Sequence, residues 1–327
     1  MLLNMEGVRK TYGDRTLLDN VSFYMKDGDR VGIVGVNGCG KSTFLRLAAG
    51  VEVPDMGTVS YDPNVRLGYL PQNPPFDPEN TVMEQVEAGL DPTAREIARY
   101  EAVEILTRLG IGDVNQKMGT LSGGQRKRVA LASVLVHPAD LLALDEPTNH
   151  LDAEMIGWLE NYLQGFSGGI LLVTHDRYFL ERVAQKTLEV SFGRLYLYDG
   201  GYSAYLDGKA RREEMDAASE RKRQTTLRRE LQWVLQGPCA RGTKSRERLE
   251  RYERLKAAQP PQTEGSLEPI RALSSRLGKK TVELQGVSKS FDGKCVLKSF
   301  DFLLQRTDRV GIVGGNGAGK STLLNLI

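Results

Sequence analysis

The sequence has little cysteine and histidine and no long hydrophobic run. Its three cysteines, Cys39, Cys239 and Cys295, are an odd and widely scattered set among 327 residues, and they fit neither a disulfide framework nor the spacing of a metal site. No apolar run approaches the ~20 residues that a membrane-spanning helix needs. The first residues also lack the basic and apolar stretches of a secretory signal. We therefore expect a cytoplasmic protein with no membrane domain in this chain.

Charge is distributed unevenly along the chain. Apolar residues make up 40% of the sequence and charged residues 26%, which is ordinary for a soluble globular protein. The net charge is only +2, but residues 209–256 carry 15 Lys and Arg against 8 Asp and Glu. This segment therefore has a net charge of +7, while the remainder of the chain has a net charge of −5. Such a segment either contacts phosphates or forms a solvated, charge-rich helical surface.

One glycine-rich segment occurs twice, once near the start of the sequence and once near its end. Residues 31–43 return with few changes as residues 310–322, and the lead-in at 7–14 returns at 286–293. Copies this far apart indicate a duplicated domain rather than a solenoid repeat. Because the second copy stops at Ile327, we interpret the chain as a C-terminally truncated fragment of a longer protein.

Short β-rich runs alternate with helical stretches through the N-terminal part of the chain. The alternation is typical of an α/β domain with a mainly parallel sheet, and residues 16–25 alternate as an antiparallel strand does. The β-rich runs are residues 141–144, 169–174, 186–190 and 194–198, and the helical stretches are residues 41–49, 123–136 and 153–163.

The basic segment predicts a pair of antiparallel helices. Leu227, Leu231 and Val234 form one apolar seam, Leu249, Tyr252 and Leu255 form another, and a glycine-proline break lies at residues 237–242. The domain organisation that we expect is a first α/β domain at 1–205, a basic helical hairpin at 206–258, a flexible linker at 259–280 and a truncated second copy of the first domain at 281–327.

A phosphate-binding loop lies between a predicted buried strand and a predicted helix. Its glycines let backbone N–H groups close around phosphates at a helix N-terminus, where Lys41 reaches the β- and γ-phosphates and Ser42 can ligate Mg²⁺. A chance glycine-rich turn would explain one match, but two copies in matching contexts favour the phosphate loop. The candidate ATP-binding residues are Gly35, Asn37, Gly38, Gly40, Lys41, Ser42 and Thr43, with Gly314, Asn316, Gly317, Gly319, Lys320, Ser321 and Thr322 in the second copy.

Two carboxylates follow the apolar run at residues 141–144. Asp145 suits a Mg²⁺ shell, and Glu146 can orient and polarise an attacking water, because phosphoryl transfer depends mainly on positioning and charge neutralisation. Acidic pairs after strands also cap helices, so the pair alone does not decide between the two roles. The upstream phosphate loop favours catalysis.

Residues Leu121, Ser122, Gly123, Gly124 and Gln125 resemble the signature motif of ATP-binding-cassette (ABC) ATPases. The resemblance implies an ABC-type P-loop NTPase fold with an antiparallel β subdomain and a helical subdomain, and it implies ATP and Mg²⁺ as cofactors. It further implies that Tyr12 and Phe291 stack on adenine, that Gln72 senses Mg²⁺ and the attacking water, and that His175 contacts the γ-phosphate. A lone histidine after a strand is otherwise often structural, but its position after the other motifs favours catalysis.

Residues 145–152 followed by residues 175–180 resemble the ABC-F family within that superfamily. That resemblance implies two ATPase domains in one chain, no membrane domain, and ribosome and tRNA as partners in translation. The hairpin tip is similar to that of the Uup-like branch, in which the candidate RNA-contacting residues would be Arg241, Lys244, Arg246 and Arg248. Trp233 could stack on a base or pack within the hairpin. The alternatives are an ATPase that binds branched DNA and the ATPase subunit of an ABC transporter.

Two features depart from the family pattern. The segment between Gln72 and the signature, residues 73–120, has room for helices near 81–88 and 93–109, so the arm of some ABC-F members would be missing or reduced to a stub. ABC sites are also composite, because each joins one domain's phosphate loop to another domain's signature, and neither site is complete in this chain. A homodimer pairing Lys41 with Ser122 of a second copy could restore hydrolysis.

Overall fold

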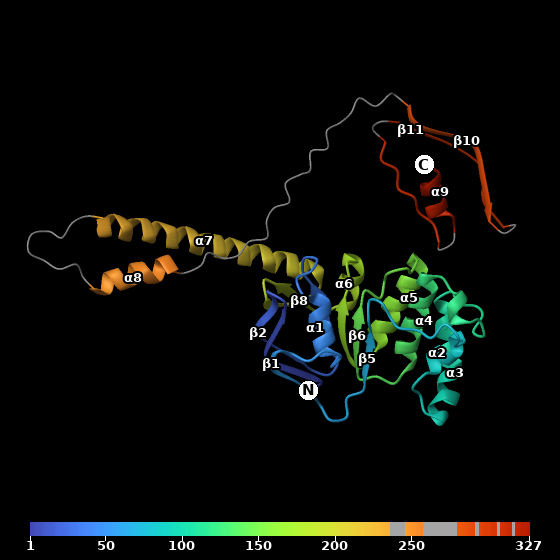
Figure 1. The fold of residues 1–327 in the computed structure, drawn as a ribbon, viewed down its shortest axis with the longest axis horizontal. Helices are drawn as coiled ribbons and strands as arrows, with labels where there is room; N and C mark the ends of the chain where they lie inside the picture. Colours follow the sequence, from blue (N-terminus) through green and yellow to red (C-terminus); the bar gives the residue numbers. More distant parts are fainter. Residues whose placement is uncertain (236–245, 258–279, 292–293, 306–307, 316–317) are drawn as a thin grey trace, which may run out of the picture. The chain divides into compact units, whose positions relative to one another are not determined.

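The computed structural model describes residues 1–235, 246–257, 280–291, 294–305, 308–315 and 318–327. Contacts divide the chain into two compact units. Three parts are described separately. The first unit contains both sheets of the N-terminal region and the helical hairpin; the helical second unit and the C-terminal segment follow. Figure 1 gives the order of the elements along the chain.

A six-stranded sheet forms the centre of the first unit, in the order β5-β6-β7-β3-β8-β9. All neighbours are parallel except β9, which runs antiparallel to β8. Every residue of β6 and β7 is buried, which explains their continuous apolar sequences. The mainly parallel sheet that the sequence predicted is therefore confirmed. The strands are β3 (Arg30–Val34), β5 (Leu67–Leu70), β6 (Leu141–Asp145), β7 (Gly169–Val173), β8 (Lys186–Ser191) and β9 (Arg194–Asp199).

A three-stranded antiparallel sheet packs into the same core. Its order is β2 (Arg15–Met25), β1 (Leu3–Tyr12) and β4 (Met56–Tyr61). Helix α1 (Lys41–Ala48) joins the two sheets, since Phe44 is fully buried and meets Phe23 of β2 edge-on at 5.4 Å. Side chains from both sheets and from α1 thus belong to one hydrophobic cluster.

The start of β6 is fixed to β5 by an ion pair. Arg66 donates from its backbone N–H and from two guanidinium nitrogens to Asp140, at 2.9–3.0 Å. Hydrogen bonds from Arg66 lower the pKa of Asp140 from 3.8 to about 2. The charged carboxylate therefore contributes to stability above pH 4.

The second unit contains helices, and two of them begin with reciprocal caps. Thr81 caps α2 together with Glu84, and Ser122 caps α4 together with Gln125, as the capping-box pattern predicts. Between Gln72 and Leu121 the described backbone forms α2, α3 and the short η1 as helices, which agrees with the two expected helices. The elements are α2 (Val82–Glu87), α3 (Pro92–Arg108), η1 (Met118–Thr120), α4 (Gly123–Val136) and α5 (Ala153–Gly165).

The basic segment forms the predicted hairpin of two helices side by side, α7 (Tyr202–Leu235) and α8 (Arg246–Ala257) (Figure 1). Helix α7 begins before residue 206, where we placed the domain boundary, because Tyr205 packs with Val34 and Leu180 of the first domain. The apolar seam of α7 was predicted in part wrongly. Leu231 is 40% exposed, whereas Glu230 is buried and paired with Arg248 of α8 at 2.5 Å. The predicted hairpin loop and flexible linker lie outside the described residues.

A buried carboxylate anchors the first turns of α7. Glu189 of β8 is fully buried and pairs with Arg212 at 2.7 Å and Lys209 at 3.3 Å. The Tyr198 hydroxyl also donates to Glu189 at 3.0 Å, and burial followed by this carboxylate raises the pKa of Tyr198. The hairpin is therefore attached directly to the sheet that carries the phosphate loop.

The second copy reproduces the start of the first. Strands β10 (Lys280–Phe291) and β11 (Lys294–Gln305) pair antiparallel as β1 and β2 do, and α9 (Lys320–Leu326) corresponds to α1. Gly319 precedes α9 with a φ of 93°, as Gly40 precedes α1 with a φ of 112°. Among the described residues, no helix combines the length and the apolar character that spanning a membrane requires.

Replacing Glu189 with Gln removes the negative charge that two cations of α7 share. We expect the free energy of unfolding to fall by roughly 1.5–3 kcal/mol, the usual strength of a hydrogen bond to a charged group, as measured by urea denaturation. The control is Glu213→Gln, because the 58% exposed Glu213 faces Lys209 at 3.9 Å, and its loss should stay below about 1 kcal/mol. Equal losses in the two variants would contradict the anchoring role of Glu189.

Replacing Asp140 with Asn should make the protein less stable at pH 7 but less sensitive to acid. The pKa of Asp140 is about 2 in the folded chain, whereas the ordinary value, which applies in the unfolded chain, is 3.8. The contribution of the Asp140 carboxylate to stability is therefore complete above pH 4 and is lost as the pH falls towards 2. In urea denaturation measured between pH 2 and 7, the difference in midpoint between wild type and variant should be constant above pH 4 and shrink as the pH falls from 4 towards 2. An unchanged difference at pH 2 would refute the assignment, and Asp27→Asn, on an exposed turn, is the control.

Candidate active site

The phosphate loop connects β3 to α1 and is shaped by glycine. A side chain at Gly35 would place its Cβ 2.4 Å from the Val190 carbonyl oxygen and 2.7 Å from Cys39 Sγ. Gly40, at the N-terminus of α1, has a left-handed φ of 112°, a conformation that other residues rarely adopt. The loop therefore requires glycine at both of these predicted positions.

The Lys41 ammonium contacts the backbone of this loop. Its Nζ donates to the carbonyl oxygens of Gly35 at 2.9 Å and Val36 at 3.1 Å. A cavity of about 360 Å³ opens beside it, and the structure brings most of the predicted first-domain residues to that cavity. The lining residues are Leu17, Asn37, Gly38, Gly40, Lys41, Ser42, Thr43, Gln72, Asp145, Glu146, Val173 and His175.

Asp145 fits the role of a magnesium ligand. It is only 4% exposed, and its Oδ1 has no hydrogen-bond partner among the described atoms. Burial raises its pKa, while the Ser42 hydroxyl, Arg46 and Lys41 act in the opposite direction. A single buried carboxylate suits Mg²⁺, since this ion is commonly held by one or two carboxylates and by substrate phosphates.

Glu146 is held in an unusual backbone conformation next to His175. Its φ is 56°, in the left-handed region, and its N–H donates to the Val173 carbonyl at 2.8 Å. His175 Nε2 lies 3.4 Å from Glu146 Oε1, and the His175 N–H donates to Oε2 at 3.4 Å. Burial raises the pKa of Glu146 despite the neighbouring histidine, which favours a group that accepts a proton.

Tyr12 lies at the end of β1, and its hydroxyl contacts charged residues that the motifs did not single out. Arg46 of α1 donates to this hydroxyl at 3.0 Å and to Thr43 Oγ1 at 3.3 Å, and Glu52 accepts from it. The signal in the sequence was the position of Arg46, one helical turn after Thr43 on the same face of α1.

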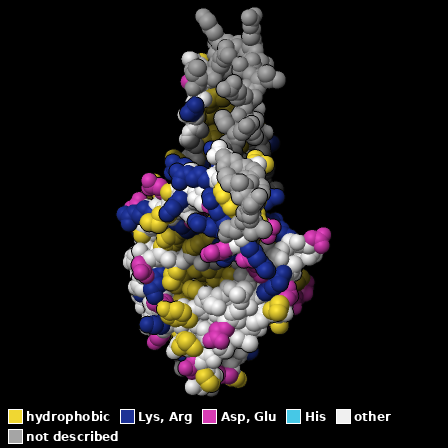
Figure 2. Space-filling model, turned by 90° about the vertical axis from the view of Figure 1, so that its left-hand side faces the viewer, with side chains coloured by type: hydrophobic (Ala, Val, Ile, Leu, Met, Phe, Trp, Pro, Cys, Tyr) yellow, Lys and Arg dark blue, Asp and Glu magenta, His cyan; other side chains and the backbone are white. Residues whose placement is uncertain are grey.

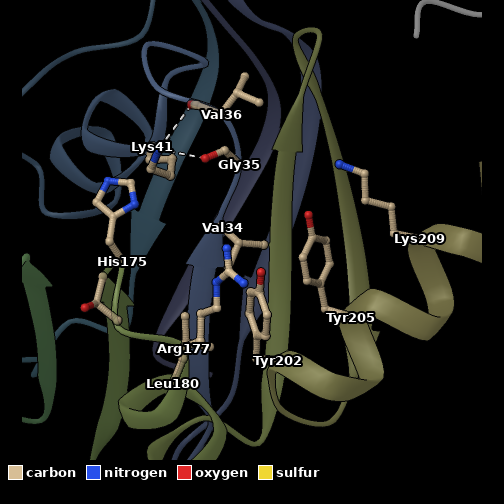
Figure 3. Close-up of a pocket in the computed structure, with 11 residues that line it drawn as sticks. Val34, Gly35, Val36, Lys41, His175, Arg177, Leu180, Tyr202, Tyr205 and Lys209 are labelled. Atoms are coloured by element: carbon tan, nitrogen blue, oxygen red, sulfur yellow. Dashed lines mark hydrogen bonds between the residues drawn. The ribbon is translucent and has the colours of Figure 1, made fainter. Parts of the chain in front are cut away.

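A second cavity, of about 370 Å³, adjoins Lys41 and His175. Figure 3 shows these two residues on one side of it and Tyr202, Tyr205 and Lys209, from α7, on the other. The first turns of the hairpin helix thus lie beside the phosphate loop. No motif in the sequence pointed to this cavity, because its walls come from segments that lie far apart in the chain.

The signature residues open helix α4 of the second unit. Ser122 accepts from the Gln125 N–H at 3.3 Å, and the Gln125 side chain accepts from the Ser122 N–H at 2.9 Å. Leu121 is buried. Ser122, Gly124 and Gln125 line a cavity of about 660 Å³ together with Arg128, His150 and Asp152. The predicted helix start at the signature is confirmed.

The second phosphate loop repeats the contacts of the first. Lys320 Nζ donates to the carbonyl oxygens of Gly314 at 2.6 Å and Gly315 at 2.9 Å, and Ser321 and Thr322 follow in α9. Asn316, Gly317 and the side chain of Phe291 lie outside the described residues.

The hairpin presents a basic surface, but its arginines differ in availability. Lys and Arg side chains gather on the face of the molecule that contains the hairpin (Figure 2). Arg246 is 93% exposed and pairs with Glu250 at 3.0 Å. Arg248 is occupied within the hairpin, because it pairs with Glu230 and lies over the Trp233 ring at 4.4 Å. Trp233 therefore packs inside the hairpin, and the predicted contacts Arg241 and Lys244 lie outside the described residues.

Comparisons with known proteins agree with this geometry. A family model described as ABC transporter matches residues 18–149 and 297–327, and a second model of that description matches residues 188–269. Two solved structures share the fold at 23–24% identity and cover 61% of this chain. They are an ATP-binding subunit of an ABC transporter (TM-score 0.55, 90% of that chain) and an ATP-binding cassette bound to ADP and Pi after hydrolysis (TM-score 0.53, 98% of that chain).

Curated relatives match along nearly the whole chain. The Bacillus subtilis ABC transporter ATP-binding protein YfmR is 40% identical over 100% of this chain and 58% of its own length. The energy-dependent translational throttle protein EttA of Mycobacterium tuberculosis is 38% identical, over 100% of this chain and 65% of its own length. The EttA of Escherichia coli K12 is 36% identical, over 96% of this chain and 63% of its own length. The chain thus spans about three-fifths of these relatives. With its phosphate loop, acidic pair and signature in place, the chain belongs to the ATP-binding-cassette family of ATPases.

Proposed function

We propose that this chain is part of an ABC-F protein that binds and hydrolyses ATP and couples ATP binding to engagement of the ribosome and tRNA. The single observation that carries the ATPase proposal is the cavity where Lys41, Asp145, Glu146 and His175 meet. The coupling proposal rests on the attachment of α7 to the sheet that bears the phosphate loop.

The chain's own residues divide the work of hydrolysis. Loop N–H groups and Lys41 bind the triphosphate, while Ser42, Asp145 and Gln72 would hold Mg²⁺. When bound, that ion would neutralise charge on the phosphate oxygens. Glu146 orients the attacking water and accepts its proton, which its raised pKa favours. His175 keeps the Glu146 carboxylate in place at 3.4 Å.

Each site in this proposal is completed by a signature from another ABC domain. The first copy supplies the phosphate loop, the acidic pair and His175, and a second domain supplies the signature that faces its γ-phosphate. Turnover by this chain alone would need a second copy of it to supply Ser122.

The translational role is supported by relatives and by the hairpin. The relatives named EttA are described as translational throttle proteins, and the second family model covers the hairpin. The net charge of +7 over residues 209–256 suits RNA phosphates, and Arg246 at the start of α8 is exposed. We assign the chain to the Uup-like branch on the hairpin sequence and place it in the cytoplasm. The same charge suits branched DNA, the second candidate partner.

Replacing Lys41 with Ala should weaken retention of labelled ATP with Mg²⁺ by about tenfold or more, because a charge-assisted contact to the phosphates is lost. Equilibrium filter binding on the full chain measures this loss. The matched control is Lys26→Ala, on an exposed turn, which should bind ATP as the wild type does. Failure of the wild type to retain ATP, or unchanged binding by the Lys41 variant, would refute the ATP site.

Replacing Glu146 with Gln should slow phosphate release roughly 100-fold or more, because the proton acceptor for water is lost, and should trap the ATP-bound protein on ribosomes. Gradient sedimentation of the full-length protein, with and without ATP, measures the association. Glu154→Gln, exposed in the first turn of α5, is the control. Equal association with ribosomes in the presence and absence of ATP would refute the ribosomal role. Preferential binding to branched DNA over tRNA-loaded ribosomes at equal salt would favour branched DNA as the partner.

A further inference from the structure

The cavity between the phosphate loop and the first turns of α7 is lined by cations. Its walls include the Lys41 ammonium, the Arg177 guanidinium and the Lys209 ammonium. None of its described lining residues is an aspartate or a glutamate. The neighbouring cavity contains the acidic pair, which suits it to Mg²⁺. The cavity beside α7 therefore has the charge that favours an anion.

The polar groups that α6 (Arg177–Val183) and α7 contribute to this cavity point towards the phosphate loop. Figure 3 shows the Arg177 guanidinium and the hydroxyls of Tyr202 and Tyr205 directed the same way, towards the side where Lys41 lies. The Lys209 side chain, one helical turn after Tyr205, extends towards the same space. Two helices and the loop thus present hydrogen-bond donors to one cavity.

Aromatic packing holds the cations from α6 and α7 in place. Tyr205 is only 7% exposed and belongs to a buried cluster with residues of β3 and α6, and its ring centroid lies 5.5 Å from that of Tyr202. The Arg177 guanidinium lies 5.4 Å from the Tyr202 ring centroid, and the Lys209 ammonium lies 5.8 Å from that of Tyr205. Because the two cations are already positioned, less entropy is lost when an anion binds between them.

The positive charge of this cavity is only partly balanced by the protein. Glu189 pairs with Lys209 at 3.3 Å, but Glu189 does not line the cavity and also pairs with Arg212 at 2.7 Å. Three like charges around one small space repel one another, and an anion between them relieves that repulsion. Ammonium and guanidinium groups are the usual partners of phosphate oxygens.

The size and position of the cavity suit inorganic phosphate. Its volume of about 370 Å³ holds a phosphate ion and several waters, since a water occupies roughly 30 Å³ of liquid. Lys41 and His175 line both this cavity and the one that contains the acidic pair. A phosphate ion can therefore move from one cavity to the other while it stays beside the same lysine.

We propose that this cavity is a binding site for inorganic phosphate and receives the ion that hydrolysis frees in the neighbouring cavity. The carboxylates of the acidic pair repel the freed ion, whereas Arg177 and Lys209 attract it. Because Lys209 also pairs with Glu189, which anchors α7, an ion bound here contacts the base of the hairpin. The identity of the ion as a reaction product rests on the proposed hydrolysis of ATP.

The test measures the binding of labelled inorganic phosphate to the full chain by equilibrium dialysis, with and without ADP and Mg²⁺. We expect Arg177→Gln and Lys209→Gln each to weaken phosphate binding roughly tenfold or more, because a charge-assisted hydrogen bond is lost. Arg177→Lys keeps the charge and should lose less affinity than Arg177→Gln. All three variants should retain ATP as the wild type does. Arg194→Gln, at an exposed arginine of β9, is the matched control and should change nothing.

The outcomes separate this inference from the proposed function. A wild type that retains ATP but binds no phosphate, or phosphate binding that neither Gln variant changes, would overturn the phosphate site and leave the proposed function intact. Equal weakening of ATP and phosphate by Arg177→Gln would show a structural effect on the loop and would also overturn the site. Phosphate binding that depends on Arg177 and Lys209 in a chain that does not retain ATP would refute the proposed function and the origin of the ion.

Discussion

The phosphate loop is held in place by burial on both sides, and the rest of the site depends on that constraint. The strand before it, β3, lies between β7 and β8 in the sheet. The helix after it, α1, buries Phe44, Leu45, Leu47 and Ala48 in a core shared by two sheets. Because both ends are fixed, the loop's N–H groups and Lys41 are positioned before any ligand arrives, which lowers the entropy lost on binding.

Buried carboxylates on the central sheet serve two different purposes, and their partners distinguish them. Glu189 on β8 is paired with two cations from α7 and fastens the hairpin to the sheet. Asp145 at the end of β6 leaves one oxygen unpartnered among the described atoms, which suits a site that takes a cation. Glu146 follows in a left-handed conformation, and such conformations are commonly maintained by surrounding structure at functional sites. The buried carboxylate on β8 therefore stabilises the fold, whereas the buried carboxylate at the end of β6 is available to a ligand.

The two copies share the contacts of the phosphate loop but differ at the end of the strand pair that precedes it. Lys41 and Lys320 make the same pair of contacts with loop carbonyls. Tyr12 and Arg46, in contrast, are replaced by Phe291 and Asn325. A duplicated domain can keep the geometry of its phosphate loop while neighbouring side chains diverge, because the loop contacts go through the backbone and one lysine.

The sequence by itself determined the α/β class, the phosphate loop, the acidic pair and the helix that opens at Ser122, because each of these follows from local spacing and hydrophobic pattern. It also identified the hairpin, although it placed Leu231 in the seam where the folded chain buries Glu230. The tertiary structure alone decided the cluster around Tyr12, the anchoring of α7 on Glu189 and the contacts of Arg248 with Glu230 and the Trp233 ring. These contacts join residues far apart in the chain or on facing helices, and side-chain pairing at that range depends on packing that periodicity does not record.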